Sequence, residues 1–246
     1  MRTIKCLLFV LASSLMLSCN KESEIRSDIY DLQRRNMVRW DLKARGIKSK
    51  PVLDAIQTVP RHLFLMERYR KDAYKDEDLP ISQFLETPKP FLVAKTIDLL
   101  ELNGSEKVLE VGTGRGYQSA LLGELAKEVY TIEIVPELYR TAEKTLQELN
   151  YKNVHCRLGD GYEGWPEKKP FDAILVMTGA KEVPQPLLDQ LAMGGRLVMP
   201  IGEVPDLTLV LYRKVSGGLR KEKIMPVTID AMQGAAAGRS LKQRVN

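Results

Sequence analysis

Residues 108–117 read Val-Leu-Glu-Val-Gly-Thr-Gly-Arg-Gly-Tyr, an apolar run that is followed at once by three glycines. The apolar run is typical of a buried strand, and the residues after Gly116 have the periodicity of a helix. Glycines in such a turn let a ligand approach the backbone closely. The helix start presents free N–H groups to polar or anionic ligand atoms. The stretch therefore predicts a strand, a ligand-binding turn and a helix.

Strand and helix patterns alternate around this turn. The predicted strands are Val108–Val111, Val129–Ile134, Val154–Leu158, Phe171–Met177, Arg196–Pro200, Leu207–Lys214 and Lys223–Ile229. The predicted helices between them are Tyr117–Ala126, Pro136–Asn150 and Pro186–Ala192. Such alternation predicts an α/β, Rossmann-like, doubly wound and mostly parallel sheet. Ser216-Gly217-Gly218 joins the last two strands, so we expect a C-terminal antiparallel hairpin.

The residues before the alternating region predict an N-terminal helical extension. Residues 24–45 place apolar side chains at helical spacing among charges, and Gly46 follows as a stop. Pro51–Gln57 and Pro90–Asn103 have the pattern of two further helices. Residues 60–90 hold several prolines and many charges and are predicted to be mainly loops.

Three acidic residues stand at or near the ends of the first three strands of the alternating region. Glu110 comes just before the glycines, where it could reach a cationic amino group. Glu133 ends the second strand, about twenty residues further on, where a carboxylate accepts hydrogen bonds from both hydroxyls of a ribose. Asp160, followed by Gly161, ends the third strand and could contact an adenine amino group. Ligands of such sheets bind outside the carboxyl ends of the strands, where the three motifs converge.

The glycine spacing distinguishes between nucleotide ligands. A dinucleotide site favours G-x-G-x-x-G, whereas this turn is G-x-G-x-G. A cation-binding acid, a glycine turn and a ribose-binding acid together suit S-adenosylmethionine. We therefore predict a methyltransferase cofactor site that is made of Glu110, Gly112, Thr113, Gly114, Gly116, Glu133, Asp160 and Gly161.

Composition excludes several other functions. The formal net charge of +5 is spread among acidic residues, so no nucleic-acid footprint is expected. Of three cysteines, Cys6 lies in the leader described next and Cys19 is the candidate for lipidation, which leaves Cys156 without an internal disulfide partner. With two histidines in the chain, no His/Cys metal cluster is expected.

The first residues have the layout of a bacterial secretory leader. Arg2 and Lys5 precede an apolar run that is too short for a comfortable transmembrane helix. Met16-Leu17-Ser18-Cys19 resembles a lipobox, which predicts a signal peptide at 1–18 and a lipid-anchored envelope protein beginning at Cys19. Residues 19–36 would form a tether and the start of the first helix, and 37–246 a single catalytic domain. The alternative is a translation start near Met37 and a cytoplasmic product.

Several stretches make the chain resemble the protein-L-isoaspartate O-methyltransferases, over roughly residues 37–213. The stretches are Met37-Val38, Arg45-Gly46-Ile47, Val59-Pro60-Arg61-His62-Leu63-Phe64, Leu79-Pro80-Ile81, Leu109–Tyr117, Val129–Glu133, Gly159-Asp160-Gly161, Gly164-Trp165-Pro166-Glu167, Pro170-Phe171-Asp172 and Gly194-Gly195-Arg196-Leu197. The Pro-Arg-His and Gly-Trp-Pro-Glu stretches are specific to this family. The resemblance implies methylation of isoaspartyl carboxyls in damaged proteins by a monomeric enzyme that uses S-adenosyl-L-methionine. His62 and Trp165 are expected to pack rather than to react.

The substrate loop departs from the family pattern. After Leu79-Pro80-Ile81 the chain reads Ser-Gln-Phe-Leu-Glu-Thr-Pro-Lys-Pro, and an ungapped alignment puts Pro88 where the family has its active-site Ser. Glu86 then stands at the family's Thr, and Leu85 at its Gln. Thr87 and Thr178 are the hydroxyls that could replace the missing Ser, so they are the catalytic candidates.

Three functions stay open from the sequence. The first is isoaspartyl methylation through a rearranged loop that uses Thr87 or Thr178. The second is methylation of a different acceptor, since Glu86 would favour a neutral or cationic group. The third is an inactive envelope-anchored binding protein, which a cavity blocked by Arg115 or Phe84 would favour.

Overall fold

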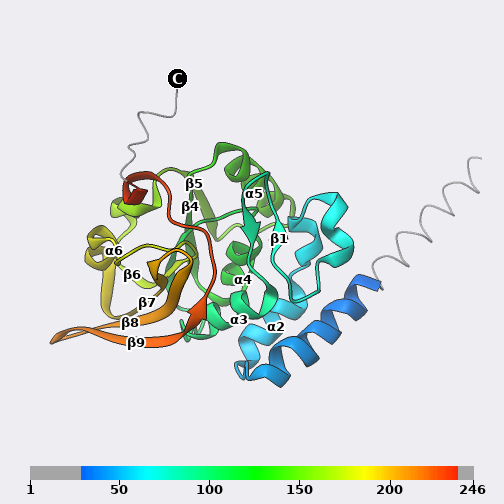
Figure 1. Ribbon diagram of the computed structural model, residues 1–246, viewed down its shortest axis with the longest axis horizontal. Coiled ribbons are helices and arrows are strands. Elements are labelled where there is room, and N and C mark those ends of the chain that lie inside the picture. The colour runs from blue at the N-terminus through cyan, green and yellow to red at the C-terminus, as the bar shows by residue number, and fades with distance from the viewer. Residues whose placement is uncertain (1–28, 238–246) are drawn as a thin grey trace, which may run out of the picture.

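The computed structural model describes residues 29–237 (Figure 1). The predicted signal peptide, Cys19 and most of the predicted tether lie outside the described residues. The described helices are α2 (Lys50–Thr58), α3 (Pro90–Asp98), α4 (Tyr117–Leu125), α5 (Pro136–Glu148) and α6 (Gln185–Gln190). Shorter 3₁₀ turns are Arg61–Phe64, Glu67–Asp72, Gly161–Glu163, Pro166–Lys168 and Gly234–Ala237.

The N-terminal helical segment, residues 29–45, precedes α2. It is α-helical over residues 29–37, widens into a π-helical turn at Val38–Leu42 and tightens into a 3₁₀ turn at Lys43–Arg45. Gly46 ends it with φ of 100°, so the predicted glycine stop is confirmed.

A seven-stranded sheet runs through the middle of the molecule. Its strands are β3 (Lys107–Val111), β4 (Glu128–Glu133), β5 (Val154–Leu158), β6 (Phe171–Val176), β7 (Leu191–Glu203), β8 (Asp206–Val215) and β9 (Gly218–Val227). Their order is β5-β4-β3-β6-β7-β8-β9, with β3 to β7 parallel and β8 and β9 antiparallel. The predicted doubly wound sheet with a C-terminal hairpin is confirmed.

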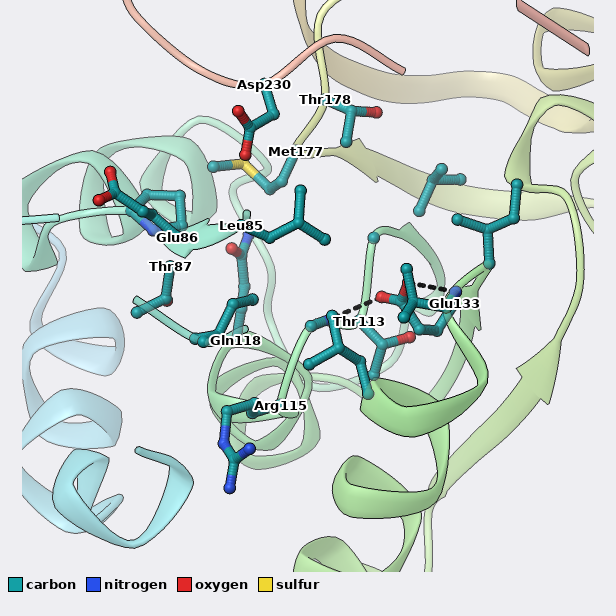
Figure 2. A pocket seen from close by; sticks show the side chains of 18 of the residues that line it. Leu85, Glu86, Thr87, Thr113, Arg115, Gln118, Glu133, Met177, Thr178 and Asp230 are labelled. Carbon is teal, nitrogen blue, oxygen red and sulfur yellow. Dashed lines mark hydrogen bonds between the residues drawn. The ribbon is translucent and has the colours of Figure 1, made fainter. Parts of the chain in front are cut away.

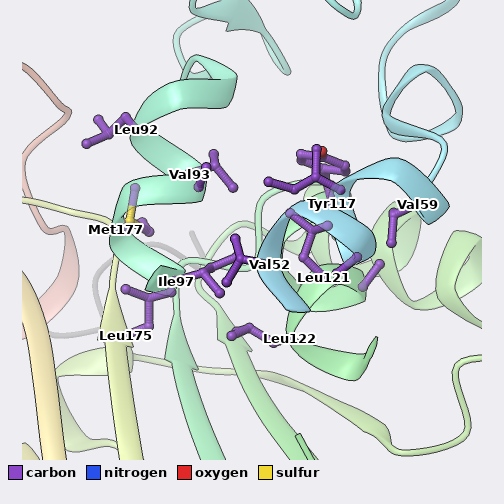
Figure 3. Packing of buried hydrophobic residues seen from close by; sticks show 14 of the residues in the cluster. Val52, Val59, Leu92, Val93, Ile97, Tyr117, Leu121, Leu122, Leu175 and Met177 are labelled. Carbon is purple, nitrogen blue, oxygen red and sulfur yellow. The ribbon is translucent and has the colours of Figure 1, made fainter. Parts of the chain in front are cut away.

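Both faces of the sheet are covered, because alternate residues of its strands point to opposite sides. On one face, residues of α2, α3 and α4 share a core with Leu175 of β6 (Figure 3), and residues of α5 and Val108 of β3 belong to the same core. On the other face, Leu109 and Ile174 belong to a second core with Leu187 of α6. Burial on both sides explains why the parallel strands read as continuous apolar runs.

Element boundaries differ from the predictions where local geometry decides them. Helix α3 ends at Asp98 rather than Asn103, and Glu101 takes a positive φ of 49° just beyond it. Strand β7 is longer than predicted at both ends. It starts at Leu191, which pairs with Phe171 of β6, so the helix predicted to reach Ala192 ends at Gln190; at the other end its antiparallel pairing with β8 continues to Glu203. Within the predicted loop region, β1 (Leu79–Pro80) and β2 (Glu86–Thr87) form a small antiparallel hairpin.

Candidate active site

A cavity opens at the carboxyl end of β3, β4 and β6, next to the β1–β2 hairpin (Figure 2). It encloses about 1020 Å³ of space, its open mouth included. The glycine turn after β3, the end of β4, the hairpin and the C-terminal segment each form part of the wall. The residues that line the cavity include Arg61, Leu85, Glu86, Thr87, Pro88, Gly112, Thr113, Gly114, Gln118, Glu133, Gly161, Thr178 and Asp230.

Some residues of the glycine turn line the cavity, and Gly116 instead allows two helices to pack closely. Gly112, Thr113 and Gly114 line the cavity as predicted. Gly116 is not in the wall; it begins α4 with φ of 95°. A Cβ at Gly116 would lie 3.3 Å from the Ala142 Cβ, so this glycine lets α4 pack closely against α5.

Glu133 lies at the end of β4 and lines the cavity as predicted. One carboxylate oxygen accepts the N–H of Gly114 at 2.8 Å, and the other accepts the N–H of Val135 at 2.9 Å (Figure 2). Burial raises the pKa of Glu133, while these backbone donors act in the opposite direction. A carboxylate can accept more than two hydrogen bonds, so both oxygens keep lone pairs for a ligand.

The position of Glu110 differs from the prediction that this side chain contacts the ligand directly. The side chain is fully buried and does not line the cavity. Its carboxylate accepts hydrogen bonds from the hydroxyls of Ser119 and Thr131. The Thr131 hydroxyl in turn lies 2.6 Å from the Thr113 hydroxyl in the turn. Burial raises the pKa of Glu110 to about 7. Glu110 thus supports the glycine turn from behind.

Asp160 is also placed differently from the prediction. Its carboxylate accepts the N–H of Tyr162 at 2.9 Å and that of Ala235 at 2.7 Å, and it is not among the lining residues. The neighbouring Gly161 does line the cavity. A Cβ at Gly161 would lie 2.3 Å from the Val111 Cγ1, so this position requires glycine. Asp160 therefore holds the C-terminal segment beside the site.

The substrate loop forms the opposite wall of the cavity. Leu85, Glu86, Thr87 and Pro88 all line it, and the Glu86 carboxylate points away from the centre in Figure 2. The pairing of Thr87 with Leu79 sets the position of the loop in the hairpin. The catalytic candidate Thr87 is therefore brought into the same cavity as Glu133.

Arg61 was not predicted as a site residue, although it lies in the quoted Pro-Arg-His stretch. It is 0 % exposed and donates hydrogen bonds to the carbonyl oxygens of Ala73 at 2.7 Å and Pro88 at 3.0 Å. Its guanidinium also lies over the Tyr117 ring, 5.6 Å from the centroid. A buried cation with bidentate geometry therefore ties the substrate loop to the core.

Three buried polar atoms of lining residues have no hydrogen-bond partner among the described residues. They are Nε of Arg61, Nε2 of Gln118 and Oγ1 of Thr178. In Figure 2 the Gln118 amide points toward Leu85 of the substrate loop. Buried polar atoms without a partner are costly, so these atoms fit a site that is completed by polar groups of a ligand. Gln118 was missed because nothing in the helix pattern separates it from a packing residue.

His62 and Trp165 pack, in agreement with the prediction. The His62 Nδ1 lies 2.8 Å from the Tyr74 hydroxyl, and its ring stacks on Tyr30 with centroids 4.1 Å apart. Burial and the nearby Arg34 and Arg70 lower the pKa of His62 to about 4. The Trp165 ring contacts Tyr130 edge to face. Neither residue lines the cavity.

The side chains that could have blocked the cavity leave it open. Arg115 turns away from the centre (Figure 2), and its Nε donates to the Phe64 carbonyl at 2.9 Å. Phe84 is 81 % exposed and is not part of the wall.

The C-terminal segment closes another side of the cavity. Residues 229–233 line it, and the bond between the Gly179 N–H and the Asp230 carbonyl, at 2.8 Å, joins the segment to the end of β6. In the same ladder, the Met232 N–H donates to the Gly179 carbonyl at 2.7 Å. No sequence motif in this segment indicates a place in the cavity wall.

Residues 29–237 contain no group of three or more side chains that could hold a metal ion. No helix within this range is long and apolar enough to span a membrane.

Comparison with known proteins identifies the family. The model of the protein-L-isoaspartate(D-aspartate) O-methyltransferase family matches residues 33–230. A protein-L-isoaspartate O-methyltransferase of Gloeobacter violaceus is 46 % identical over 192 residues, which cover 78 % of this chain and 94 % of that one. One from Syntrophobacter fumaroxidans is 49 % identical over 187 residues, covering 76 % and 87 %.

Solved structures agree with this assignment. A protein-L-isoaspartate O-methyltransferase superimposes with a TM-score of 0.76 at 28 % identity, covering 82 % of this chain and 67 % of that one. A Plasmodium falciparum protein, described as such an enzyme in complex with S-adenosyl-L-homocysteine, shares the fold with a TM-score of 0.70 at 23 % identity, covering 81 % and 98 %. The cavity, the sequence relatives and the fold together lead to one conclusion: this chain belongs to the protein-L-isoaspartate O-methyltransferase family, the S-adenosylmethionine-dependent enzymes that methylate isoaspartyl residues.

Proposed function

We propose that this chain methylates isoaspartyl carboxylates through a rearranged substrate loop, with the methyl donor bound beside Glu133 and the acceptor beside Thr87. The observation that carries the proposal is the single cavity in which the glycine turn, Glu133 and the substrate loop meet. Damaged proteins or peptides with isoaspartyl residues are the expected partners, and a monomer is the expected state.

The chemistry asks mainly for positioning. A carboxylate acceptor is already ionised at neutral pH, so its oxygen needs no general base. S-adenosylmethionine, when bound, supplies a methyl group on a positively charged sulfur. The task of the protein is to hold the two reactants in line and to exclude water.

On the donor side, the backbone fixes the Glu133 carboxylate through the Gly114 and Val135 N–H groups. This carboxylate would accept ribose hydroxyls with its remaining lone pairs. The buried Glu110 and Thr131 keep the turn in place without entering the cavity, and they reach it through the hydroxyl of Thr113, which lines the cavity.

On the acceptor side, Pro88 offers neither a hydroxyl nor an N–H. Donors that line the cavity include the Thr87 and Thr178 hydroxyls and the Gln118 amide. The buried Arg61 cation also lines the cavity, where it favours an anionic acceptor. These groups would together replace the hydroxyl that the family loop supplies.

A second acceptor class is supported by a specific observation. Glu86 and Asp230 are two acidic residues that line the cavity. Carboxylates near the acceptor would favour a neutral or cationic group over an isoaspartyl anion. The open cavity speaks against the third function, an inactive binding protein, because Arg115 and Phe84 do not fill it.

We also propose an envelope location with a lipid on Cys19, on the basis of the lipobox-like stretch. Two contacts support a chain that starts before Met37. Tyr30 stacks on His62, and an Arg34 nitrogen donates to the Thr58 carbonyl at 3.2 Å. A start at Met37 would remove both contacts.

The test uses the full chain, purified in detergent, and two peptides that differ only in an aspartyl or isoaspartyl linkage. We expect methyl incorporation into the isoaspartyl peptide alone and micromolar binding of S-adenosylhomocysteine by calorimetry. Binding of the cofactor product without isoaspartyl methylation would point to the second acceptor class. A folded chain that does not bind S-adenosylhomocysteine would overturn the donor site.

A further inference from the structure

The N-terminal helical segment presents an unusual outward surface. Ile29, Leu32 and Trp40 are 48 %, 54 % and 59 % exposed. Their spacing of three and eight residues places them on one side of the helix. In Figure 1 this segment, drawn in blue, lies along the border of the molecule. We call the exposed side chains of residues 29–43 the outer face.

The opposite side of the segment is firmly packed. Met37 and Leu42 are fully buried in the core, and Tyr30 packs against it. Arg34 bonds to Asp31 at 2.9 Å and to the Thr58 carbonyl at 3.2 Å. These contacts fix the rotation of the helix, so the apolar residues of the outer face cannot turn inward.

The outer face is also strongly basic. It exposes three cations, of which Arg35 pairs with Asp31, and residues 29–50 as a whole carry seven basic and two acidic side chains. Arg35, Arg39 and Lys43 follow one another at helical spacing and are all exposed. The Arg39 guanidinium lies over the Trp40 ring, 4.6 Å from the centroid.

We propose that the outer face docks on the surface of an anionic phospholipid bilayer. Tryptophan is suited to the boundary between lipid headgroups and acyl chains, because its ring is apolar and its N–H is polar. Arginine and lysine stems lie along apolar surface while their charged ends reach phosphates. A helix with apolar and basic residues on one exposed face binds by both effects and lies in the membrane plane.

The charge favours a membrane over a second copy of the chain. Two outer faces brought together would place like charges opposite each other, whereas an anionic bilayer complements them. The position in the chain favours the same partner. The predicted lipid site, Cys19, lies ten residues before Ile29. Ten residues span about 35 Å at most, so an anchor there would hold the outer face close to the bilayer. The tether length supports docking only if Cys19 carries a lipid, as proposed above. The exposed apolar and basic residues support docking without it.

The first test follows Trp40 itself. The chain has two tryptophans, so Trp165→Phe leaves Trp40 as the sole reporter in the full chain. We expect its emission to shift to shorter wavelength, and brominated lipids to quench it, when the protein is reconstituted into phosphatidylglycerol-containing vesicles. The matched control Trp40→Phe keeps Trp165, which packs against Tyr130 and should not respond.

The second test separates docking from anchoring. In the Trp165→Phe chain, Arg35→Gln, Arg39→Gln and Lys43→Gln together should weaken docking about a hundredfold, at about fivefold for each cation near an anionic surface. The Trp40 shift would then be lost at the same lipid composition. The matched control is Arg220→Gln, Lys221→Gln and Lys223→Gln on the exposed strand β9, which should change nothing.

Two outcomes would overturn the proposal. One is a Trp40 emission that stays unchanged on anionic vesicles while circular dichroism shows a folded protein. The other is a dimer, detected by light scattering without lipid, that Leu32→Ser and Trp40→Ser abolish. Methyl transfer is not part of either readout, so the enzymatic proposal and this one fail independently.

Discussion

The two walls of the cavity are built in different ways. On the donor wall, backbone N–H groups hold Glu133, and a buried chain of Glu110, Thr131 and Thr113 supports the turn from behind. The acceptor wall is a hairpin of two very short strands, tied to the core through the Pro88 carbonyl by Arg61. The donor wall keeps the family motifs, whereas the acceptor wall departs from them. A family can thus preserve cofactor binding while its acceptor loop changes.

The largest effect is expected on the donor wall. Glu133→Ala should weaken S-adenosylhomocysteine binding at least about a hundredfold, because hydrogen bonds to a charged group contribute about 1.5–3 kcal/mol each. Calorimetric titration measures this loss. Glu137→Ala, an exposed acid in the first turn of α5, is the matched control and should bind normally. Equal binding by both variants would remove Glu133 from the site.

The buried support of the donor wall should appear in the pH dependence of stability. The pKa of Glu110 is about 7 in the folded protein and 4.5 as its ordinary value. The folded state therefore binds the extra proton, and the free energy of unfolding should fall by about 3 kcal/mol as the pH rises from 4.5 to 7. Urea unfolding at several pH values measures this. In Glu110→Gln the free energy of unfolding should not show this fall. If it changes with pH in the same way in both proteins, the raised pKa does not belong to Glu110.

Loss of the Arg61 hydrogen bonds, which join the acceptor wall to the core, should affect only the binding of the acceptor. Arg61→Lys cannot hold both the Ala73 and the Pro88 carbonyl, so the substrate loop loses its position. We expect KM for the isoaspartyl peptide to rise about tenfold, with S-adenosylhomocysteine affinity unchanged. Arg68→Lys, an exposed neighbour, is the control. A parallel loss of cofactor affinity would show that Arg61 acts on the whole fold instead.

The acceptor hydroxyls are expected to give an effect no larger than that of Arg61→Lys. Thr87→Val and Thr178→Val each remove one donor to the ionised acceptor carboxylate, and at the low end of the range for charged groups this hydrogen bond is worth about 1.5 kcal/mol or about tenfold in kcat/KM. Steady-state assays with the isoaspartyl peptide compare the two variants. A loss in one variant alone would identify which hydroxyl replaces the missing serine. Unchanged kinetics in both would leave the Gln118 amide as the acceptor contact.

Regular repetition made the fold predictable from the sequence, because buried parallel strands and amphipathic helices have distinct periods. Glu133 was predictable for a similar reason, since its place at a strand end decides where it lies. Glu110 and Asp160 also stand at strand ends, but side-chain direction and a distant segment decide what they contact. Arg61 holds carbonyls that are 12 and 27 residues away in the chain, and no local pattern carries that information.

Residues 229–233 form a wall of the cavity and follow all seven strands of the sheet in the chain, so they are synthesised after them. A nascent chain still attached to the ribosome can pair β3 with β4 and position Glu133, but it cannot enclose a ligand. The donor would therefore be held by the glycine turn and Glu133 alone until residues 229–233 are added. A chain that ends shortly after β9 would keep the whole sheet and have a cleft in place of an enclosed site.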